Sequence, residues 1–195
     1  MLKDLIKLNR SYRKFYEAEI NINTLKELIE LAKLSPSPRN LQALKFIISN
    51  NKKTNNNIFE QLAWAGYITD WNGPEKGERP SAYIIILGDK NLSDNFERDF
   101  IYTASGIVSQ SILLGAIEKE LGGCIIAAIK KNKIKEILNI SDDLEILLVI
   151  ALGKPKEEII IERVKNNDIK YWRDENEAHH VPKREIEELI IKIID

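Results

Sequence analysis

The chain of 195 residues is long enough for one domain with a buried core, and its 44% hydrophobic and 30% charged residues are typical of a globular protein. Its 29 basic and 30 acidic side chains leave a formal net charge of -1, so no general field favours nucleic acid or an anionic membrane. The single cysteine, Cys124, excludes an internal disulfide and suits a reducing compartment. The N-terminus lacks the apolar block of a signal peptide, so we expect a cytoplasmic protein.

The chain begins with a helical pattern over 2–8, which is followed by the basic turn RSYRKF at 10–15. Two guanidiniums, a hydroxyl and an ammonium in this turn would converge on a phosphate, because arginine presents forked donors that match phosphate oxygens. A solvated basic turn is the alternative, and for an isolated cluster it is the favoured interpretation.

A second amphipathic helix is predicted to open at Asn23 or Thr24 and to end at the segment SPSPRNLQ, 35–42. Two prolines predict a rigid, extended loop here, which carries the amides of Asn40 and Gln42. Amides can meet both donors and acceptors on a heteroaromatic ring. A plain structural turn is an equally good interpretation of this segment.

The segment 66–80 holds three glycines and two prolines, too many for regular structure. Long irregular segments in compact domains are often lids or binding loops, so we expect a lid that carries Tyr67 and Trp71. In the alternative interpretation these aromatic side chains, together with Trp64, cap the core.

The longest predicted helix covers 94–121 and begins with Asp94 and Glu97 as an N-cap pair. It has no charged side chain between Asp99 and Glu118, so it is expected to be a buried core helix. Its serines, threonine and glutamine dilute it far below the hydrophobicity of a membrane span. Because a domain of this size seldom encloses such a helix completely, part of it is expected to face a second copy of the chain.

Small residues recur along this helix at helical spacing, including Ser111 with Gly115, and they would let another helix or a ligand approach its backbone. The other predicted elements are strands over 44–49, 82–87, 124–129 and 146–152, a polar loop over 50–57, and helices over 58–65 and 131–138. Strands that alternate with helices favour an α/β or α+β layered fold with both sheet faces covered.

The segment after the last central strand is charged and poorly periodic over 156–180, and VPKREIEELIIKIID, 181–195, is predicted as a final amphipathic helix. A C-terminal arm of this length, 156–195, is most simply explained if it wraps a partner subunit.

Acid–base and metal chemistry find little support in the sequence. His179 and His180 are adjacent, Cys124 is the only other soft ligand, and no metal-ligand spacing occurs, so we expect no metal. No Gly-rich phosphate loop and no nucleophile paired with a histidine are recognisable. The chain is rich instead in places to hold a phosphate and a ring, which favours a cofactor that carries the chemistry.

These pieces together resemble the nitroreductase family of FMN-dependent oxidoreductases. The likeness spans nearly the whole chain and rests on the order and spacing of several segments. These are RSYRKF, SPSPRNLQ, GIVSQSILLGA leading to LGGC, the strand before GKPKE, and HHVPKR. It implies an α+β fold with a central, mostly antiparallel sheet flanked by helices, in a single domain over 1–195. It also implies an intertwined homodimer with a C-terminal arm and two FMN sites at the subunit interface.

The resemblance assigns FMN contacts by position. It places the ribityl phosphate on Arg10, Ser11, Arg13, Lys183 and Arg184. It lines the flavin, from the partner chain, with Pro36, Ser37, Asn40 and Gln42. Near the N5 and O4 edge it places the backbone N–H groups of Ala127, Ala128 and Ile129, which would favour the negative charge of the reduced ring.

Two departures from the family pattern affect this site. Arg39 stands where many relatives have glycine or another small residue, and it adds a cation close to the expected ring position. Ala128 stands near where some relatives carry glutamate, which removes a carboxylate from the flavin edge. Arg39, Tyr67 and Trp71 are therefore candidate substrate lid residues.

The resemblance implies an oxidoreductase in which NADH or NADPH delivers hydride to flavin N5 and an electron-poor acceptor, such as a nitroaromatic or quinone, then takes its place. The flavin carries the chemistry, and no side chain acts as an essential acid. The alternatives are a flavin-binding carrier or sensor without turnover, and a specialised flavin enzyme of the dehalogenase or dehydrogenase type. Both the acceptor and the choice of nicotinamide stay open.

Overall fold

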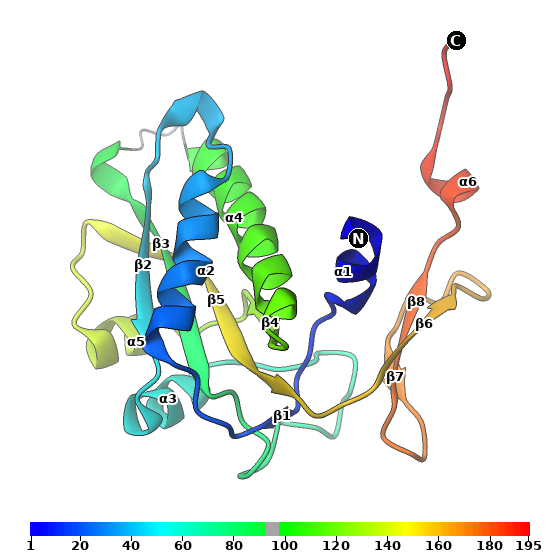
Figure 1. Cartoon of the computed structure of the whole chain (residues 1–195), viewed down its shortest axis with the longest axis horizontal. Helices are drawn as coiled ribbons and strands as arrows, with labels where there is room; N and C mark the ends of the chain where they lie inside the picture. The colour runs from blue at the N-terminus through cyan, green and yellow to red at the C-terminus, as the bar shows by residue number, and fades with distance from the viewer. Residues whose placement is uncertain (93–97) are drawn as a thin grey trace. The chain divides into compact units, whose positions relative to one another are not determined.

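The computed structural model spans 1–195 and describes all residues except 93–97 (Figure 1). The predicted N-cap pair, Asp94 and Glu97, lies outside the described residues. Contacts divide the chain into two compact units: the core unit, 1–64 with 73–156, and the arm unit, 65–72 with 157–195. The single domain over 1–195 stays a prediction.

A five-stranded antiparallel sheet forms the centre of the core unit. Its strands are β1 (Phe15–Tyr16), β2 (Leu44–Ser49), β3 (Ala82–Asp89), β4 (Gly122–Ile126) and β5 (Leu144–Pro155). The order is β1-β5-β3-β2, and β4 pairs with β5. Every residue of β3 from Ala82 to Gly88 is buried, because the strand lies in the middle of the sheet with both faces covered, as its unbroken apolar run predicts.

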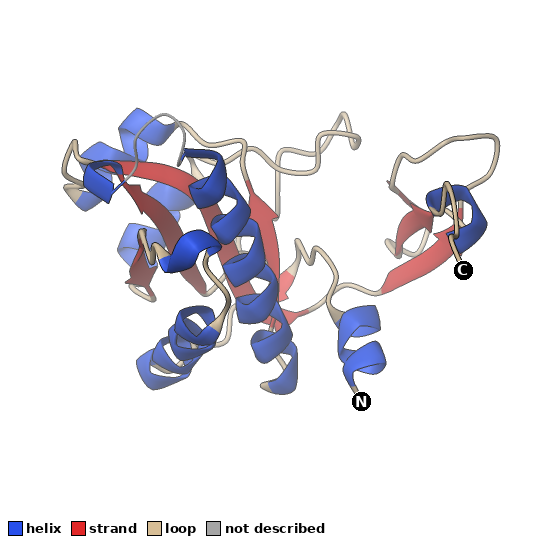
Figure 2. Ribbon diagram, turned by 90° about the horizontal axis from the view of Figure 1, so that it is seen from above, coloured by secondary structure: helices blue, strands red, loops and turns tan. Residues whose placement is uncertain are grey.

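Helices α2 (Ile22–Leu34) and α4 (Arg98–Glu118) lie together on one face of this sheet (Figures 1 and 2). The main hydrophobic cluster joins both helices to Ile84 and Ile86 of β3. A Cβ added at Gly115 would lie 2.1 Å from Cδ1 of Leu31, so α2 packs directly on the glycine. This confirms the close helix approach predicted from the small residues.

The opposite face of the sheet carries α3 (Lys52–Phe59) and α5 (Lys131–Leu138), which contact each other and bury Ile58 and Ile134. The remaining helix of the core unit is the short α1 (Leu2–Leu8). The mixed α+β architecture with an antiparallel sheet confirms the predicted fold class.

Helix α4 is, within the described parts of the chain, the one helix long and apolar enough to cross a membrane by length and composition. Half of the apolar stretch of this helix is buried inside this chain. Ile112 and Ala116 are fully buried, whereas Tyr102 and Gln110 are exposed. Its contacts with α2, β4 and β5 are those of a core helix with one uncovered side.

The prediction for 50–65 is wrong, because α3 occupies the expected loop and ends at Phe59. Asn51 begins the helix by accepting hydrogen bonds from the backbone N–H and the hydroxyl of Thr54. Asn55, three residues before the buried Ile58, accepts from Ser49 and donates to the carbonyl of Ser81. A polar sequence thus forms a helix, because its buried amide hydrogen-bonds to two strand ends.

Three other boundaries differ from the predictions. Helix α2 begins at Ile22, since Asn21 caps it by accepting from the N–H of Asn23. Strand β5 is longer than the predicted 146–152, and β4 begins and ends earlier than the predicted 124–129. Gly122 pairs with Gly153 at the start of β4, and the pairing ends with Ile126 opposite Val149.

The arm unit contains a small sheet that the sequence analysis did not predict. Its strands are β6 (Ile159–Arg163), β7 (Trp172–Arg173) and β8 (His179–Lys183), in the order β6-β8-β7. The predicted helix over 181–195 is wrong, because α6 covers only Ile186–Leu189. Its apolar side chains, such as Ile191 and Ile194, are exposed, so no packing stabilises a longer helix.

Candidate functional site

The basic turn is anchored by its two aromatic residues. Tyr12 lies against Gly122, where a Cβ would meet the ring at 2.4 Å, and Phe15 lies against Gly153, where a Cβ would meet it at 2.6 Å. The backbone N–H of Tyr12 also donates to the carbonyl of Gly123 at 3.0 Å. Glycines on β4 and β5 therefore hold the turn beside the first residues of β4.

The basic side chains of this turn leave hydrogen-bond donors for an anion. Arg10 donates to the carbonyl of Ile6 at 2.8 Å, while its buried Nε has no hydrogen-bond partner. Arg13 is buried and donates to the carbonyl of Ser11 at 3.1 Å. Ser11 itself is exposed. A buried guanidinium nitrogen without a partner is costly, so an anion at this turn would satisfy it.

Strand β4 leads from the basic turn towards the predicted flavin edge. Ile125 is 39% exposed between buried neighbours, and Ala127 and Ala128 are exposed. Five residue steps of about 3.3 Å separate Gly123 from Ala128, or about 16 Å in all. The N–H of Ala63 donates to the carbonyl of Ala128 at 3.0 Å, which fixes the exit of the strand. The exposed Ile125 therefore lies between the basic turn and the exposed residues Ala127 and Ala128.

The loop over 35–42 differs from the rigid, extended form that was predicted. It contains a 3₁₀ turn over Pro38–Asn40, with positive φ at Arg39, Asn40 and Gln42. Asparagine tolerates this conformation, but arginine and glutamine rarely adopt it, so their backbone is strained. The hydroxyl of Ser37 accepts from the N–H of Gln42 at 3.1 Å and holds the turn closed.

This loop borders a pocket of about 220 Å³ between α2, β2 and α4. Three of the four predicted flavin-lining residues of the loop lie on its wall: Pro36, Ser37 and Gln42. Asn40 is exposed outside it, and so is Arg39. Phe46 and Val108 form the apolar wall. The structure thus brings the loop residues together around a concave surface.

Sequence reasoning missed two polar residues of this region, Lys33 and Ser35. Ser35 links the loop to α4 through a hydrogen bond of 2.7 Å to Ser111. The spacing of small residues on α4 was the available signal, since Ser111 lies one helical turn before Gly115.

The remaining predicted site residues lie in the arm unit. Lys183 ends β8, and Arg184 donates to Asn167 at 3.1 Å and to Glu188 at 3.0 Å. Tyr67 and Trp71 contact other arm residues: the Tyr67 ring lies 5.0 Å from that of Tyr171, and the guanidinium of Arg173 lies 4.3 Å from the Trp71 ring. Their role as a lid stays a prediction.

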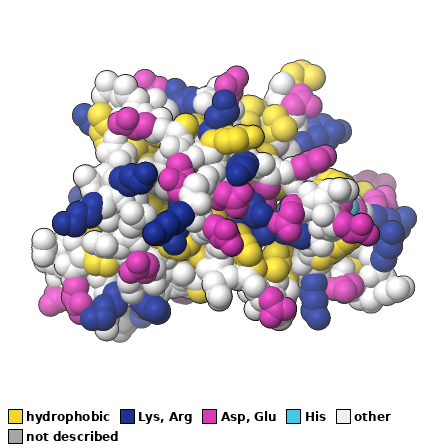
Figure 3. Space-filling view, turned by 90° about the horizontal axis from the view of Figure 1, so that it is seen from below, with side chains coloured by type: hydrophobic (Ala, Val, Ile, Leu, Met, Phe, Trp, Pro, Cys, Tyr) yellow, Lys and Arg dark blue, Asp and Glu magenta, His cyan; other side chains and the backbone are white. Residues whose placement is uncertain are grey.

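Trp64 is only 6% exposed and packs against Phe59, so it caps the core, as the alternative interpretation proposed. Among the described residues, no three histidine, cysteine or carboxylate side chains lie together in a way that could hold a metal. Acidic and basic side chains are interspersed on the face of the molecule in Figure 3. Anion binding on that face would therefore depend on local donors.

Comparisons with known proteins match this chain to one family. The sequence model of the Nitroreductase family matches residues 6–154. MhqN of Bacillus subtilis strain 168, named provisionally as an NAD(P)H nitroreductase, is 26% identical, in an alignment that covers 79% of this chain and 88% of MhqN.

Two solved structures are similar over most of their length. A nitroreductase family protein from Clostridium novyi NT is 26% identical, with a TM-score of 0.66 over 80% of this chain and 86% of that one. An FMN-dependent nitroreductase from Clostridium difficile R20291 is 23% identical, with a TM-score of 0.63 over 84% and 91%, and it shares the fold. The family match covers most of the chain and the fold agrees with it, so this protein belongs to the nitroreductase family.

Proposed function

We propose that the protein is an FMN-dependent oxidoreductase that takes hydride from NADH or NADPH and passes it to an electron-poor acceptor such as a nitroaromatic or a quinone. One observation carries the proposal: the basic turn with Arg10 and Arg13 is held against the start of β4, and the exposed Ile125 of this strand lies between the turn and 127–129. The names of MhqN and of the Clostridium difficile relative support the nicotinamide and the flavin respectively.

The residues present fit the phosphate of FMN. Arg10, Ser11 and Arg13 would hold it, and the buried, unpartnered Nε of Arg10 is the donor that needs an anion. Lys183 and Arg184 are proposed to add two further cations.

The residues along β4 would orient the ring and tune its charge. Ile125 offers an apolar surface for one ring face, and the backbone N–H groups of 127–129 would donate towards the edge that becomes negative on reduction. Bound FMN would supply the hydride transfer itself. Arg39 would add a cation near the acceptor, while Tyr67 and Trp71 would limit the access of water and acceptor.

We also propose that the working form is a homodimer in which Pro36, Ser37, Asn40 and Gln42 of each protomer line the flavin bound mainly by the other. Helix α4 has an uncovered side, and large apolar residues on α1 and at the C-terminus are exposed, among them Leu2 and Ile191. Large apolar side chains left exposed on each of these elements favour a protein partner. The proposed location is the cytoplasm.

The test begins with the purified protein. We expect it to carry, or take up, one FMN per protomer with a flavin absorbance spectrum, and to be reduced anaerobically by NADH or NADPH. Reoxidation by a panel of nitroaromatics and quinones would then identify the acceptor class. A protein that takes up no FMN would overturn the proposal, and a bound flavin that neither nicotinamide reduces would favour the carrier or sensor instead.

A further inference from the structure

The basic turn is also held by a second turn of the core unit, at 75–79, which contacts the peptide bond between Lys14 and Phe15. The carbonyl of this peptide accepts from the backbone N–H of Lys156, the residue after β5, at 3.0 Å. Its N–H donates to the carbonyl of Glu78 at 2.9 Å. The carbonyl and the N–H of a trans peptide point in opposite directions, so this peptide lies between the end of β5 and the turn at 75–79.

The carboxylate of Glu78 connects the two sides of this peptide. Its Oε1 accepts a hydrogen bond from Nζ of Lys156 at 2.8 Å, and its Oε2 lies 3.8 Å from Nζ of Lys14. The hydrogen bond to Glu78 raises the pKa of Lys156, as expected for an ammonium that gains an anionic partner. We call these two ion pairs, with Lys14 and with Lys156, the Glu78 bridge.

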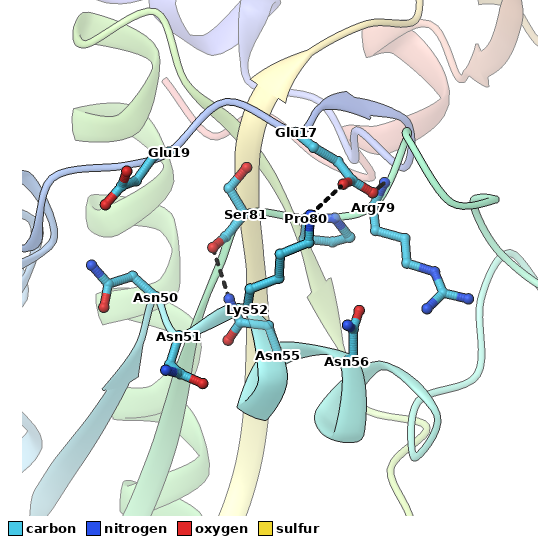
Figure 4. Close-up of a pocket in the computed structure, with 10 residues that line it drawn as sticks. All are labelled: Glu17, Glu19, Asn50, Asn51, Lys52, Asn55, Asn56, Arg79, Pro80 and Ser81. Atoms are coloured by element: carbon cyan, nitrogen blue, oxygen red, sulfur yellow. Dashed lines mark hydrogen bonds and ion pairs between the residues drawn. The ribbon is translucent and has the colours of Figure 1, made fainter.

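Backbone groups on either side of Glu78 hold the turn at 75–79 in place. Oε1 of Glu17, the residue after β1, accepts from the N–H of Gly77 at 2.7 Å and from the N–H of Arg79 at 3.4 Å (Figure 4). Gly77 has a φ of 94°, a conformation that glycine adopts without strain. The position of Glu78 is therefore fixed by contacts on both of its sides in the sequence.

The Glu78 bridge gives Lys14 a different role from the one predicted for it. Its ammonium was expected to converge on a phosphate with the other polar groups of the basic turn, yet it lies beside Glu78. Arg13, the preceding residue, donates to the carbonyl of Ser11 at 3.1 Å. Because the peptide held from both sides begins one residue after Arg13, loss of the bridge would free the backbone that carries this guanidinium.

We propose that Glu78 is a positioning residue for the flavin phosphate: its bridge fixes the basic turn so that Arg10, Ser11 and Arg13 can hold the anion. This inference rests on the proposed function. It requires a carboxylate to strengthen the binding of an anion. A carboxylate that acted on the phosphate only through its charge would repel it, so its removal would tighten the binding.

The experiment measures the affinities of FMN and riboflavin for the parent chain, Glu78→Gln, Lys156→Gln and the double variant. Each single change should weaken FMN binding by about two- to fivefold, the effect expected of a partly exposed ion pair. Riboflavin lacks the phosphate and should bind all four proteins alike, whereas a merely structural role of Glu78 would change both affinities. The double variant should bind FMN no more weakly than the weaker single variant, because both changes open one bridge.

Two matched variants control for the change of charge. Glu75→Gln lies in the same turn and Lys154→Gln lies on β5; both residues are exposed, and both variants should bind FMN like the parent. A second readout needs no flavin. The amide of Phe15 donates to the Glu78 carbonyl, so its hydrogen exchange should be faster in Glu78→Gln than in the parent.

Three results would overturn the inference while the parent chain binds FMN. They are an unchanged or tighter FMN affinity in Glu78→Gln, losses of affinity that add in the double variant, and equal exchange of the Phe15 amide in Glu78→Gln and the parent. A parent chain that takes up no FMN overturns the proposed function, and this inference with it.

Discussion

The ring of Tyr12 lies on the bare backbone of Gly122, where a Cβ would stand 2.4 Å from its Cδ2 atom. The Tyr12 hydroxyl donates to the carbonyl of Leu8 at 2.9 Å, so the ring cannot easily move aside. A glycine at the start of one strand thereby holds the basic turn that follows α1. Contact between residues 110 positions apart in the sequence is what positions the candidate phosphate site.

Gly122→Ala should therefore destabilise the protein by about 1–3 kcal/mol, because the added methyl group overpacks the contact. It should also weaken FMN binding, since the turn must shift to relieve the clash. Chemical denaturation and flavin titration would measure both effects. Gly66→Ala, where a Cβ meets nothing within 4 Å, is the control and should leave stability nearly unchanged.

Replacing both Arg10 and Arg13 by alanine should release FMN while the fold is kept. Hydrogen bonds to charged groups contribute about 1.5–3 kcal/mol each, so the loss in flavin affinity should be about a hundredfold or more. Equilibrium dialysis against FMN, with circular dichroism for the fold, would test this. The exposed pair Lys3→Ala/Lys7→Ala removes the same charge from α1 and should retain the flavin. If the arginine variant binds FMN as tightly as the parent, the basic turn is solvated and does not hold the phosphate.

Glu157→Gln should unfold part of the arm unit. Glu157 lies 3.0 Å from Nη2 of Arg173, and both side chains are almost fully buried. Removal of one partner leaves a buried charge uncompensated, at a cost of about 3–5 kcal/mol. Hydrogen exchange of the β6–β8 amides would detect the change. In Glu175→Gln, a change at an exposed neighbouring residue, these amides should exchange as they do in the parent. If the amides of Glu157→Gln are as well protected as those of the parent, the expectation is contradicted.

Tyr83 should make the protein sensitive to alkali. Burial raises its pKa above the ordinary value of 10.0, so above about pH 10 the unfolded chain loses this proton while the folded chain keeps it. Stability should then fall by up to about 1.4 kcal/mol per pH unit from this group. Urea unfolding at pH 9 and pH 11 should show a smaller loss in the free energy of unfolding for Tyr83→Phe than for the parent. Tyr16→Phe, at an exposed site, should lose as much free energy of unfolding as the parent.

Removal of residues 186–195 should weaken the proposed homodimer and spare the core unit. The apolar side chains of this segment, such as Ile191 and Ile194, are exposed in one chain and would each contribute about 1.5–3 kcal/mol if a partner buried them. Analytical ultracentrifugation across a dilution series should show dissociation of the truncated chain at concentrations where the parent stays dimeric. If both chains dissociate at the same concentrations, residues 186–195 do not contribute to the dimer interface.

Several structural features could be predicted because they depend on local patterning. The apolar run of β3 and the uncharged stretch of α4 each predicted a buried element, since hydrophobic burial is read directly from residue type and period. The basic turn was recognised by its residue types, but its anchoring needed Gly122 and Gly153, which the sequence does not mark as neighbours.

Other features could not be predicted, because they depend on contacts between segments that are distant in the sequence. Helix α3 was missed because Asn55 is stabilised by Ser49 and by the Ser81 carbonyl, partners that only the folded sheet brings together. The final helix was predicted from the helical spacing of its apolar residues. Such a segment forms a stable helix only when another surface covers its apolar face, and here the helix covers only Ile186–Leu189.

By itself the sequence determined the layered α+β class, the central position of β3 and α4, and a chain whose motifs resemble nitroreductases. Only the tertiary structure decided that the basic turn lies beside β4, that three loop residues share one pocket, and that Glu78 pairs with Lys14 and Lys156. Periodicity and composition report what each segment would bury, whereas a site depends on which distant segments fill the space beside it.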